Sequence, residues 1–290
     1  MHQILLYYKY VHLIDPETVC LWQKNLCEKL GLTGRIIVAA EGINGTVEGE
    51  LKNTKAYTKE MNHYPAFAGI NWKRSEGNGK AFPKLSVKVR DEIVTTGEKN
   101  KDFGPLASKT GKYLTAKELY NWYREEKEFY VLDMRNDYEY EVGRFKNSIW
   151  PDGLGHFRDV KNSIKTIEHL KDKTIVTVCT GGVRCETASG LLQKYGFENV
   201  YQLEHGIVTF MDKYPNTYWE GKLYVFDSRE LYGKGESIGK CRICGKTTEN
   251  MVNYFKDGKN TYGVVCEECC ENKMVELEGK YKSRFEYKTI

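Results

Sequence analysis

This chain of 290 residues is 40% hydrophobic and contains 21 tyrosines, a composition that is typical of a packed globular protein and excludes a disordered one. Its net charge is only +4, positive in the two end segments and slightly negative in the middle, so we expect a polyanionic partner to contact the end segments. No apolar run approaches the roughly 20 residues of a membrane span, and the N-terminus lacks the pattern of a signal peptide, so no membrane partner is expected.

The first segment, residues 1–97, is predicted to be a domain of strands and helices, with Asp15 as the cap of the first helix. Periodicity predicts strands at 4–10, at 34–40, from 45 onward and at 85–89, and helices at 16–30 and 54–64. The order βαββαβ indicates an α+β ferredoxin-like (acylphosphatase-like) sandwich, in which two helices cover an antiparallel sheet.

A glycine-rich run, residues 41–46 with the sequence Glu-Gly-Ile-Asn-Gly-Thr, lies inside this first segment. The pair Asn44-Gly45 favours a tight turn with positive φ. The alternative is that exposed backbone amides of the run contact an RNA phosphate.

A linker is predicted at residues 98–111, followed by a second segment, residues 112–215, in which strands and helices alternate. The predicted strands lie at 129–132, 174–178 and 199–203, and the predicted helices at 115–127, 164–170, 186–195 and 206–213. This alternation indicates a parallel α/β sheet, whose ligand sites belong at the carboxyl ends of the strands. Asp133 and Cys179 both fall at such ends, so we expect the functional site there.

The strongest chemical signal is the run of residues 179–184, Cys-Thr-Gly-Gly-Val-Arg, between a buried strand and a helix. Converging backbone N–H groups and the positive helix N-terminus favour the thiolate form of Cys179, and Gly181 and Gly182 let the loop close tightly. Only four residues separate Cys179 from Arg184, one fewer than in the Cys-based phosphatases, so the ring suits a sulfur better than a phosphate. The alternative is an ordinary buried core cysteine.

The second segment resembles the rhodanese domain. The runs that carry the resemblance are residues 130–135, 138–139, 143–145, 179–184 and 195–201. The resemblance implies an α/β rhodanese-like domain whose loop cysteine, Cys179, can carry a persulfide. It also implies that Asp133 and Arg135 support the fold beside the loop.

The whole chain resembles the tRNA uridine 5-hydroxylase (TrhO) family, because runs at 40–46, 179–186, 219–221 and 226–229 occur together. The resemblance implies an enzyme that uses molecular oxygen as co-substrate to make 5-hydroxyuridine at the wobble position of tRNA. Cys179 would be its essential cysteine and Cys185 the neighbour in the motif. The basic first segment would help to bind the tRNA anticodon region, and neither DNA nor a flavin or nucleotide cofactor is expected.

A cysteine thiolate adds readily to C6 of a uracil ring and makes C5 electron-rich, so Cys179 is the candidate nucleophile. Arg184 either braces the developing charge or only closes the loop, and Cys185 is either a second thiol or simply buried. The wobble base has to leave its stack to reach such a site. The candidate aromatic residues to receive it are Tyr138, Trp150 and Phe157.

The third segment, residues 216–290, is short and rich in cysteine. Two Cys-x-x-Cys pairs with 21 residues between them have a spacing typical of a tetrahedral zinc site. The expected ligands are Cys241, Cys244, Cys266 and Cys269, and the adjacent Cys270 leaves the fourth ligand open. The alternatives are metal-free thiols or local disulfides. The odd total of nine cysteines favours a reducing, cytoplasmic setting.

Three functions are compatible with these features. The first is a tRNA-modifying enzyme that hydroxylates the wobble uridine. The second is a sulfurtransferase that moves sulfane sulfur from thiosulfate or a persulfide to a thiol, also through Cys179. The third is a non-catalytic binding module built on an inactive rhodanese domain. The intact Cys179 argues against the third, and the two flanking segments, which simple sulfur transfer does not need, favour the first.

Overall fold

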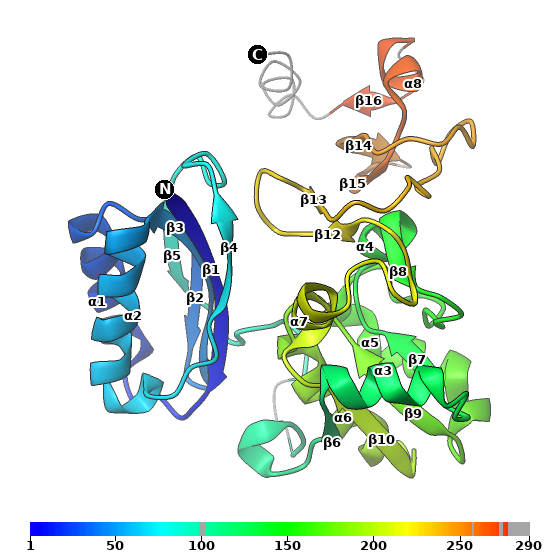
Figure 1. The fold of residues 1–290 in the computed structure, drawn as a ribbon, viewed down its shortest axis with the longest axis horizontal. Coiled ribbons are helices and arrows are strands. Elements are labelled where there is room, and N and C mark those ends of the chain that lie inside the picture. Colours follow the sequence, from blue (N-terminus) through cyan, green and yellow to red (C-terminus); the bar gives the residue numbers. More distant parts are fainter. Residues whose placement is uncertain (99–101, 257, 273–274, 278–290) are drawn as a thin grey trace.

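The computed structural model describes residues 1–98, 102–256, 258–272 and 275–277. These residues form three parts: an N-terminal sheet with two helices, a central sheet surrounded by helices, and a small C-terminal part of short strands (Figure 1). Within the described residues, no helix combines the length and the apolar character needed to cross a membrane.

The N-terminal part is a five-stranded sheet in the order β4-β1-β3-β2-β5. Its elements are β1 (His2–Tyr10), α1 (Pro16–Lys29), β2 (Thr33–Ala39), β3 (Gly42–Glu50), α2 (Leu51–His63), a 3-10 turn (Pro65–Phe67), β4 (Lys73–Gly77) and β5 (Leu85–Val89). Strand β5 is parallel to β2, and the other pairs are antiparallel. The predicted sandwich is confirmed, and Asp15 caps α1 by accepting a hydrogen bond from the N–H of Thr18 at 2.9 Å.

Strand β4 was not predicted from the sequence. Its sequence, Lys-Arg-Ser-Glu-Gly, contains no large apolar residue, so periodicity could not reveal it. It pairs with β1 at one edge of the sheet. The strand predicted at 85–89 exists, but it extends the opposite edge beside β2.

The two faces of this sheet have different partners. Leu5, Tyr7, Ile36 and Val38 are buried in one apolar cluster with residues of α1 and α2. Leu6 and the other alternate residues of β1 point to the opposite face, which is turned toward the central and C-terminal parts (Figure 1).

The turn predicted at Asn44-Gly45 was wrong. Both residues lie inside β3, and the turn that precedes this strand is at residues 40–41. Gly45 is required by packing, because a Cβ atom there would lie 2.5 Å from Oη of Tyr7. Since β3 pairs with β1 on one side and β2 on the other, its amides belong to the sheet, which also argues against the proposed phosphate contact.

The central part contains a parallel sheet, as predicted, and the order of its strands is β6-β10-β9-β7. Its strands are β6 (Lys112–Leu114), β7 (Tyr130–Asp133), β9 (Thr174–Val178) and β10 (Asn199–Leu203). Its helices are α3 (Ala116–Arg124), α4 (Asp137–Val142), α5 (Val160–Ser163), α6 (Val183–Lys194) and α7 (Gly206–Lys213), with 3-10 turns at Pro105–Ala107, Phe157–Asp159 and Ile164–Leu170. The short elements β6, α4 and α5 were not predicted from the sequence.

The C-terminal part consists of short strands that extend the central part. Strand β11 (Trp219–Gly221) pairs with β8 (Gly143–Phe145), and β12 (Leu223–Tyr224) pairs with β13 (Leu231–Tyr232). The last elements are β14 (Met251–Lys256), β15 (Lys259–Val264), α8 (Glu267–Glu271) and β16 (Glu276–Leu277), and their sheet has the order β15-β14-β16. Arg229 reaches the N-terminal sheet and donates to Oγ of Ser75 at 3.1 Å.

Candidate active site

The Cys179 loop has the strand–loop–helix geometry predicted for it. Cys179 directly follows β9, and α6 begins at Val183. Gly182 has a φ of 101°, which favours glycine, and its N–H donates to Sγ of Cys179 at 3.2 Å. Gly206 allows close approach of the next helix, because a Cβ there would lie 2.6 Å from N of Gly182.

The surroundings of Cys179 favour its thiolate form. Burial alone would raise its pKa, but hydrogen bonds from the Cys185 thiol and the backbone of Arg184 and Cys185, together with the Arg184 charge, lower the pKa to about 6. Cys185 is fully buried, and burial and the neighbouring thiolate raise its own pKa well above the ordinary value. Cys185 therefore acts here as a hydrogen-bond donor rather than as a second thiolate.

Arg184 closes the loop through a buried carboxylate. Its two terminal nitrogens donate to Oε2 and Oε1 of Glu139 at 2.6 and 2.8 Å. Thr180 also donates to Glu139, at 3.0 Å. Glu139, on α4, is fully buried and was missed as a site residue; its place in a rhodanese-like run was the available signal. The Arg184 charge is largely committed to this pair, so the geometry favours closing of the loop over stabilisation of a developing charge.

Asp133 and Arg135 form a second buried ion pair, with Nη2 of Arg135 at 2.6 Å from Oδ2 of Asp133. Both side chains are fully buried, and neither lines the cavity described below. Arg135 also donates to the carbonyl of Gly143 at 2.6 Å, where α4 ends and β8 begins. The pair thus holds the segment that presents Glu139 to the loop, as the resemblance implied.

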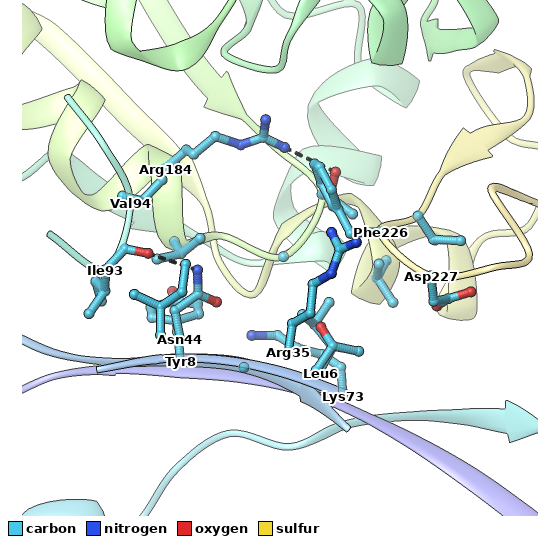
Figure 2. Close-up of a pocket in the computed structure, with 18 of the residues that line it drawn as sticks. Leu6, Tyr8, Arg35, Asn44, Lys73, Ile93, Val94, Arg184, Phe226 and Asp227 are labelled. Carbon is cyan, nitrogen blue, oxygen red and sulfur yellow. Dashed lines mark hydrogen bonds between the residues drawn. The ribbon is translucent and has the colours of Figure 1, made fainter. Parts of the chain in front are cut away.

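A cavity of about 440 Å³ lies between the open face of the N-terminal sheet and the Cys179 loop (Figure 2). From the sheet side it is lined by residues that include Leu6, Tyr8, Arg35, Asn44, Lys73 and Arg90. From the opposite side it is lined by residues that include Thr180, Gly181, Arg184, Phe226 and Tyr232. Its size is within the range of small-molecule sites, roughly 300–1,000 Å³.

The sulfur of Cys179 is covered in this structure and does not line the cavity. Leu6 lies against Gly181, where an added Cβ would be 3.1 Å from Cδ2 of Leu6, and Oη of Tyr8 would be 2.9 Å from a Cβ on Gly182. The Tyr8 hydroxyl donates to Oε1 of Glu186 at 3.0 Å. Leu6 and Tyr8 therefore pack against the two glycines of the Cys179 loop.

The cavity carries more positive than negative side chains. Its lining cations are Arg35, Lys73, Arg74, Arg90, Arg158, Arg184 and Arg229, and its lining acids are Glu92, Asp212 and Asp227. Arg229 is paired with Asp227 at 2.7 Å. In the part of the chain that the structure describes, Arg35 and Arg158 make no ion pair. This excess of cations favours an anionic partner.

Of the three aromatic candidates, one lies at the cavity. Phe157 lines the cavity, whereas Tyr138 packs in edge-on contacts with other tyrosines and Trp150 donates to the carbonyl of Arg135 at 3.0 Å. The lining aromatic residues that were missed are Tyr8, Phe226 and Tyr232. They come from segments distant in sequence, so no local pattern marked them.

The four predicted metal ligands lie together, as expected. The sulfur atoms of Cys241, Cys244, Cys266 and Cys269 are all within 4.8 Å of one another. Cys270 lies outside this group. The structure shows all nine cysteines as free thiols.

Three family models match consecutive parts of the chain. A UPF0176 acylphosphatase-like domain matches residues 2–93, a rhodanese-like domain matches residues 115–213, and a rhodanese C-terminal model matches residues 220–277. Among solved structures, the rhodanese-like domain of the Alr3790 protein from Anabaena is similar over 49% of this chain and all of its own length, at 18% identity and a TM-score of 0.33.

Curated relatives match almost the entire chain. A Corynebacterium urealyticum protein is 41% identical over 94% of this chain and 95% of its own length. An Arthrobacter protein is 40% identical over 94% of this chain and 95% of its length, and a Cytophaga hutchinsonii protein is 39% identical over 93% and 86%. All three are named tRNA uridine(34) hydroxylase.

Proposed function

Because this chain belongs to the tRNA uridine(34) hydroxylase family, we propose that it hydroxylates carbon 5 of the wobble uridine of tRNA with the Cys179 thiolate as nucleophile. The observation that carries the proposal is the ionised Cys179, cradled by the Gly182 amide at a loop that forms one wall of a basic cavity. The relatives match across all three parts of the chain, so the N-terminal sheet belongs to the same enzyme as the loop.

The chemistry begins with addition of the Cys179 sulfur to C6 of the uracil ring. The S–C6 bond forms while the π electrons of the C5–C6 bond move toward C5 and O4, which makes C5 reactive toward an oxidant. Molecular oxygen is the proposed co-substrate: one oxygen atom becomes the 5-hydroxyl group, and the other leaves as water with two electrons and two protons from an external thiol reductant. Cleavage of the S–C6 bond and loss of the proton on C5 then restore the C5–C6 double bond and free the Cys179 thiolate.

The anticodon region of the tRNA is the proposed ligand of the cavity and its rim. Arg35, Arg90 and Arg158 are exposed cationic side chains around the opening, and they suit the phosphates of a single-stranded loop. Phe157 and Phe226 provide aromatic surfaces for an unstacked base. The wobble base would displace Leu6 and Tyr8 to reach Cys179.

A structural zinc ion is proposed for the cluster of Cys241, Cys244, Cys266 and Cys269. Four sulfur atoms within 4.8 Å of one another fit the thiolate donor set of a closed tetrahedral site. The ion would supply folding free energy to a part of the chain with a small apolar core, and none of the four cysteines lines the cavity. Zinc content measured on the purified protein tests this assignment: about one equivalent supports it, and less than about a tenth contradicts it.

A cytoplasmic location is proposed from the nine unpaired cysteines, which need a reducing compartment.

The activity is tested with purified full-length protein, tRNA transcripts and nucleoside mass spectrometry. We expect 5-hydroxyuridine at the wobble position with oxygen present, and loss of the product without oxygen or in Cys179→Ser. Full hydroxylation by Cys179→Ser would exclude the nucleophilic role. Sulfur transfer from thiosulfate is measured in parallel, since the same thiolate could carry it; that activity without hydroxylation would overturn the proposal.

A further inference from the structure

Lys73 is a buried cation whose ammonium group finds no acceptor atom among the residues that the structure describes. It lies on β4 and is only 6% exposed, yet its side chain makes no hydrogen bond and no ion pair with them. Its Nζ lies 4.6 Å from the centre of the Tyr8 ring. Its side chain lines the cavity. Buried ammonium groups are normally paired, so the position indicates a hydrogen-bond acceptor that enters from the cavity.

The side chain is close to the Cys179 loop although it comes from another part of the chain. Burial lowers the pKa of Lys73 to about 8, against the raising influence of the charges on Cys179 and Glu186. Figure 2 shows Lys73 and Tyr8 on the sheet side of the cavity and Arg184 on the opposite side. Because Glu139 neutralises Arg184, Lys73 is the better placed cation for a ligand beside the sulfur.

Resting on the proposed function, we infer that the Lys73 ammonium group donates to the 4-carbonyl oxygen of the target base, selects uracil over cytosine and stabilises the charge formed on that oxygen. When the Cys179 sulfur bonds to C6, the electron pair of the C5–C6 double bond shifts through C4 to this oxygen and leaves an enolate. No electrons are lost in this step, and expulsion of the sulfur reverses it. The ammonium group is positioned to hold the enolate oxygen.

The selectivity follows from the donor chemistry of lysine. An ammonium group has three donors and no acceptor. Uracil presents a carbonyl acceptor at position 4, whereas cytosine presents an amino donor there. Two donors would face each other in the cytosine complex without a shared acceptor, and the buried Lys73 charge would stay uncompensated.

The first test compares Lys73→Met with Lys59→Met in the full-length protein. Lys59 is exposed on α2, which covers the other face of the sheet, so this control removes the same charge away from the cavity. We expect Lys73→Met to lower kcat/KM on tRNA by about 100-fold, while its Kd for tRNA changes by less than about threefold. Lys59→Met keeps the wild-type rate.

The second test measures selectivity by binding alone. In the Cys179→Ala background, two transcripts that differ only in uridine or cytidine at the wobble position are titrated against Lys73 and Lys73→Gln. We expect about a tenfold preference for the uridine transcript with Lys73 and a preference below about twofold with Lys73→Gln, whose amide oxygen can accept from the cytosine amino group.

The outcomes separate this inference from the proposed function. Absence of hydroxylation by the wild-type protein refutes the proposed function and the inference that rests on it. Normal kcat/KM in Lys73→Met refutes the inference alone. An equal loss of tRNA affinity and rate shows that Lys73 contacts a phosphate instead, and an unchanged base preference in Lys73→Gln also overturns it. If Lys73→Met does not fold by thermal melting, the binding test with Lys73→Gln decides.

Discussion

The buried pair between Arg184 and Glu139 gives the sharpest test of what holds the loop together. The two terminal nitrogens of Arg184 lie 2.6 and 2.8 Å from the carboxylate oxygens of Glu139, and the side chains of Arg184 and Glu139 are 7% and 0% exposed. Arg184→Met would leave the Glu139 carboxylate buried, with hydrogen bonds only from Thr180 and the N–H of Asn136. Removing one member of such a pair costs about 3–5 kcal/mol in the free energy of unfolding. Glu139→Leu leaves Arg184 unpaired, and we expect a similar loss.

The double variant Arg184→Met/Glu139→Leu distinguishes the pair from two independent contributions. The double variant removes both buried charges. We therefore expect its loss of unfolding free energy to be smaller than the sum of the losses in the two single variants by about 2 kcal/mol or more. Urea unfolding at pH 7 measures all four proteins. Lys194→Met is the control, because Lys194 and its partner Asp102 are 45% and 60% exposed, so its loss should cost about 1 kcal/mol or less.

Two results would refute this reasoning: single losses below about 1 kcal/mol, or additive losses in the double variant. The pH dependence is a second check. Burial opposes ionisation of Glu139, but Arg184 outweighs it and lowers the pKa of the carboxyl below its ordinary value. The stability contributed by the pair is therefore present above the ordinary pKa and is lost as the pH falls through the lowered one.

Three further predictions concern access, ionisation and packing. The rate of Cys179 alkylation by iodoacetamide should rise through pH 6 and level off above pH 7, since the pKa is about 6. A pH–rate curve of the folded protein with its midpoint above about pH 8 would contradict a lowered pKa of Cys179. Tyr8→Phe loses the hydroxyl contact with α6, so alkylation at pH 7 should become several-fold faster, and an unchanged rate would show that Tyr8 does not control access. Gly45→Ala should lower the free energy of unfolding by about 1–3 kcal/mol because the added Cβ would collide with Tyr7. The control Gly155→Ala adds a Cβ with no atom within 4 Å and should leave the free energy of unfolding unchanged. Equal unfolding curves for the two variants would refute the packing argument.

The interior of the site follows from nonlocal contacts that no sequence window contains. Lys73 lies on a strand with no large apolar residue, so neither the strand nor the buried cation was predicted. Glu139 becomes a partner of Arg184 only because α4 packs beside the loop. The wrong prediction of a turn at Asn44-Gly45 also has a nonlocal cause. The dipeptide has a turn-like sequence, but hydrogen bonding of its strand to β1 and β2, together with the ring of Tyr7, places it inside β3.

The sequence by itself predicted the strand–loop–helix geometry around Cys179 and the two Cys-x-x-Cys pairs. Residues 179–184 lie within one strand–loop–helix unit, and each Cys-x-x-Cys pair within one knuckle, so their geometry depends on adjacent residues. Only the tertiary structure decided that Leu6 and Tyr8 pack against the Cys179 loop and that Lys73 lines the cavity beside it. Those relations join side chains more than 100 residues apart in sequence, and only packing of the N-terminal sheet against α6 brings them together.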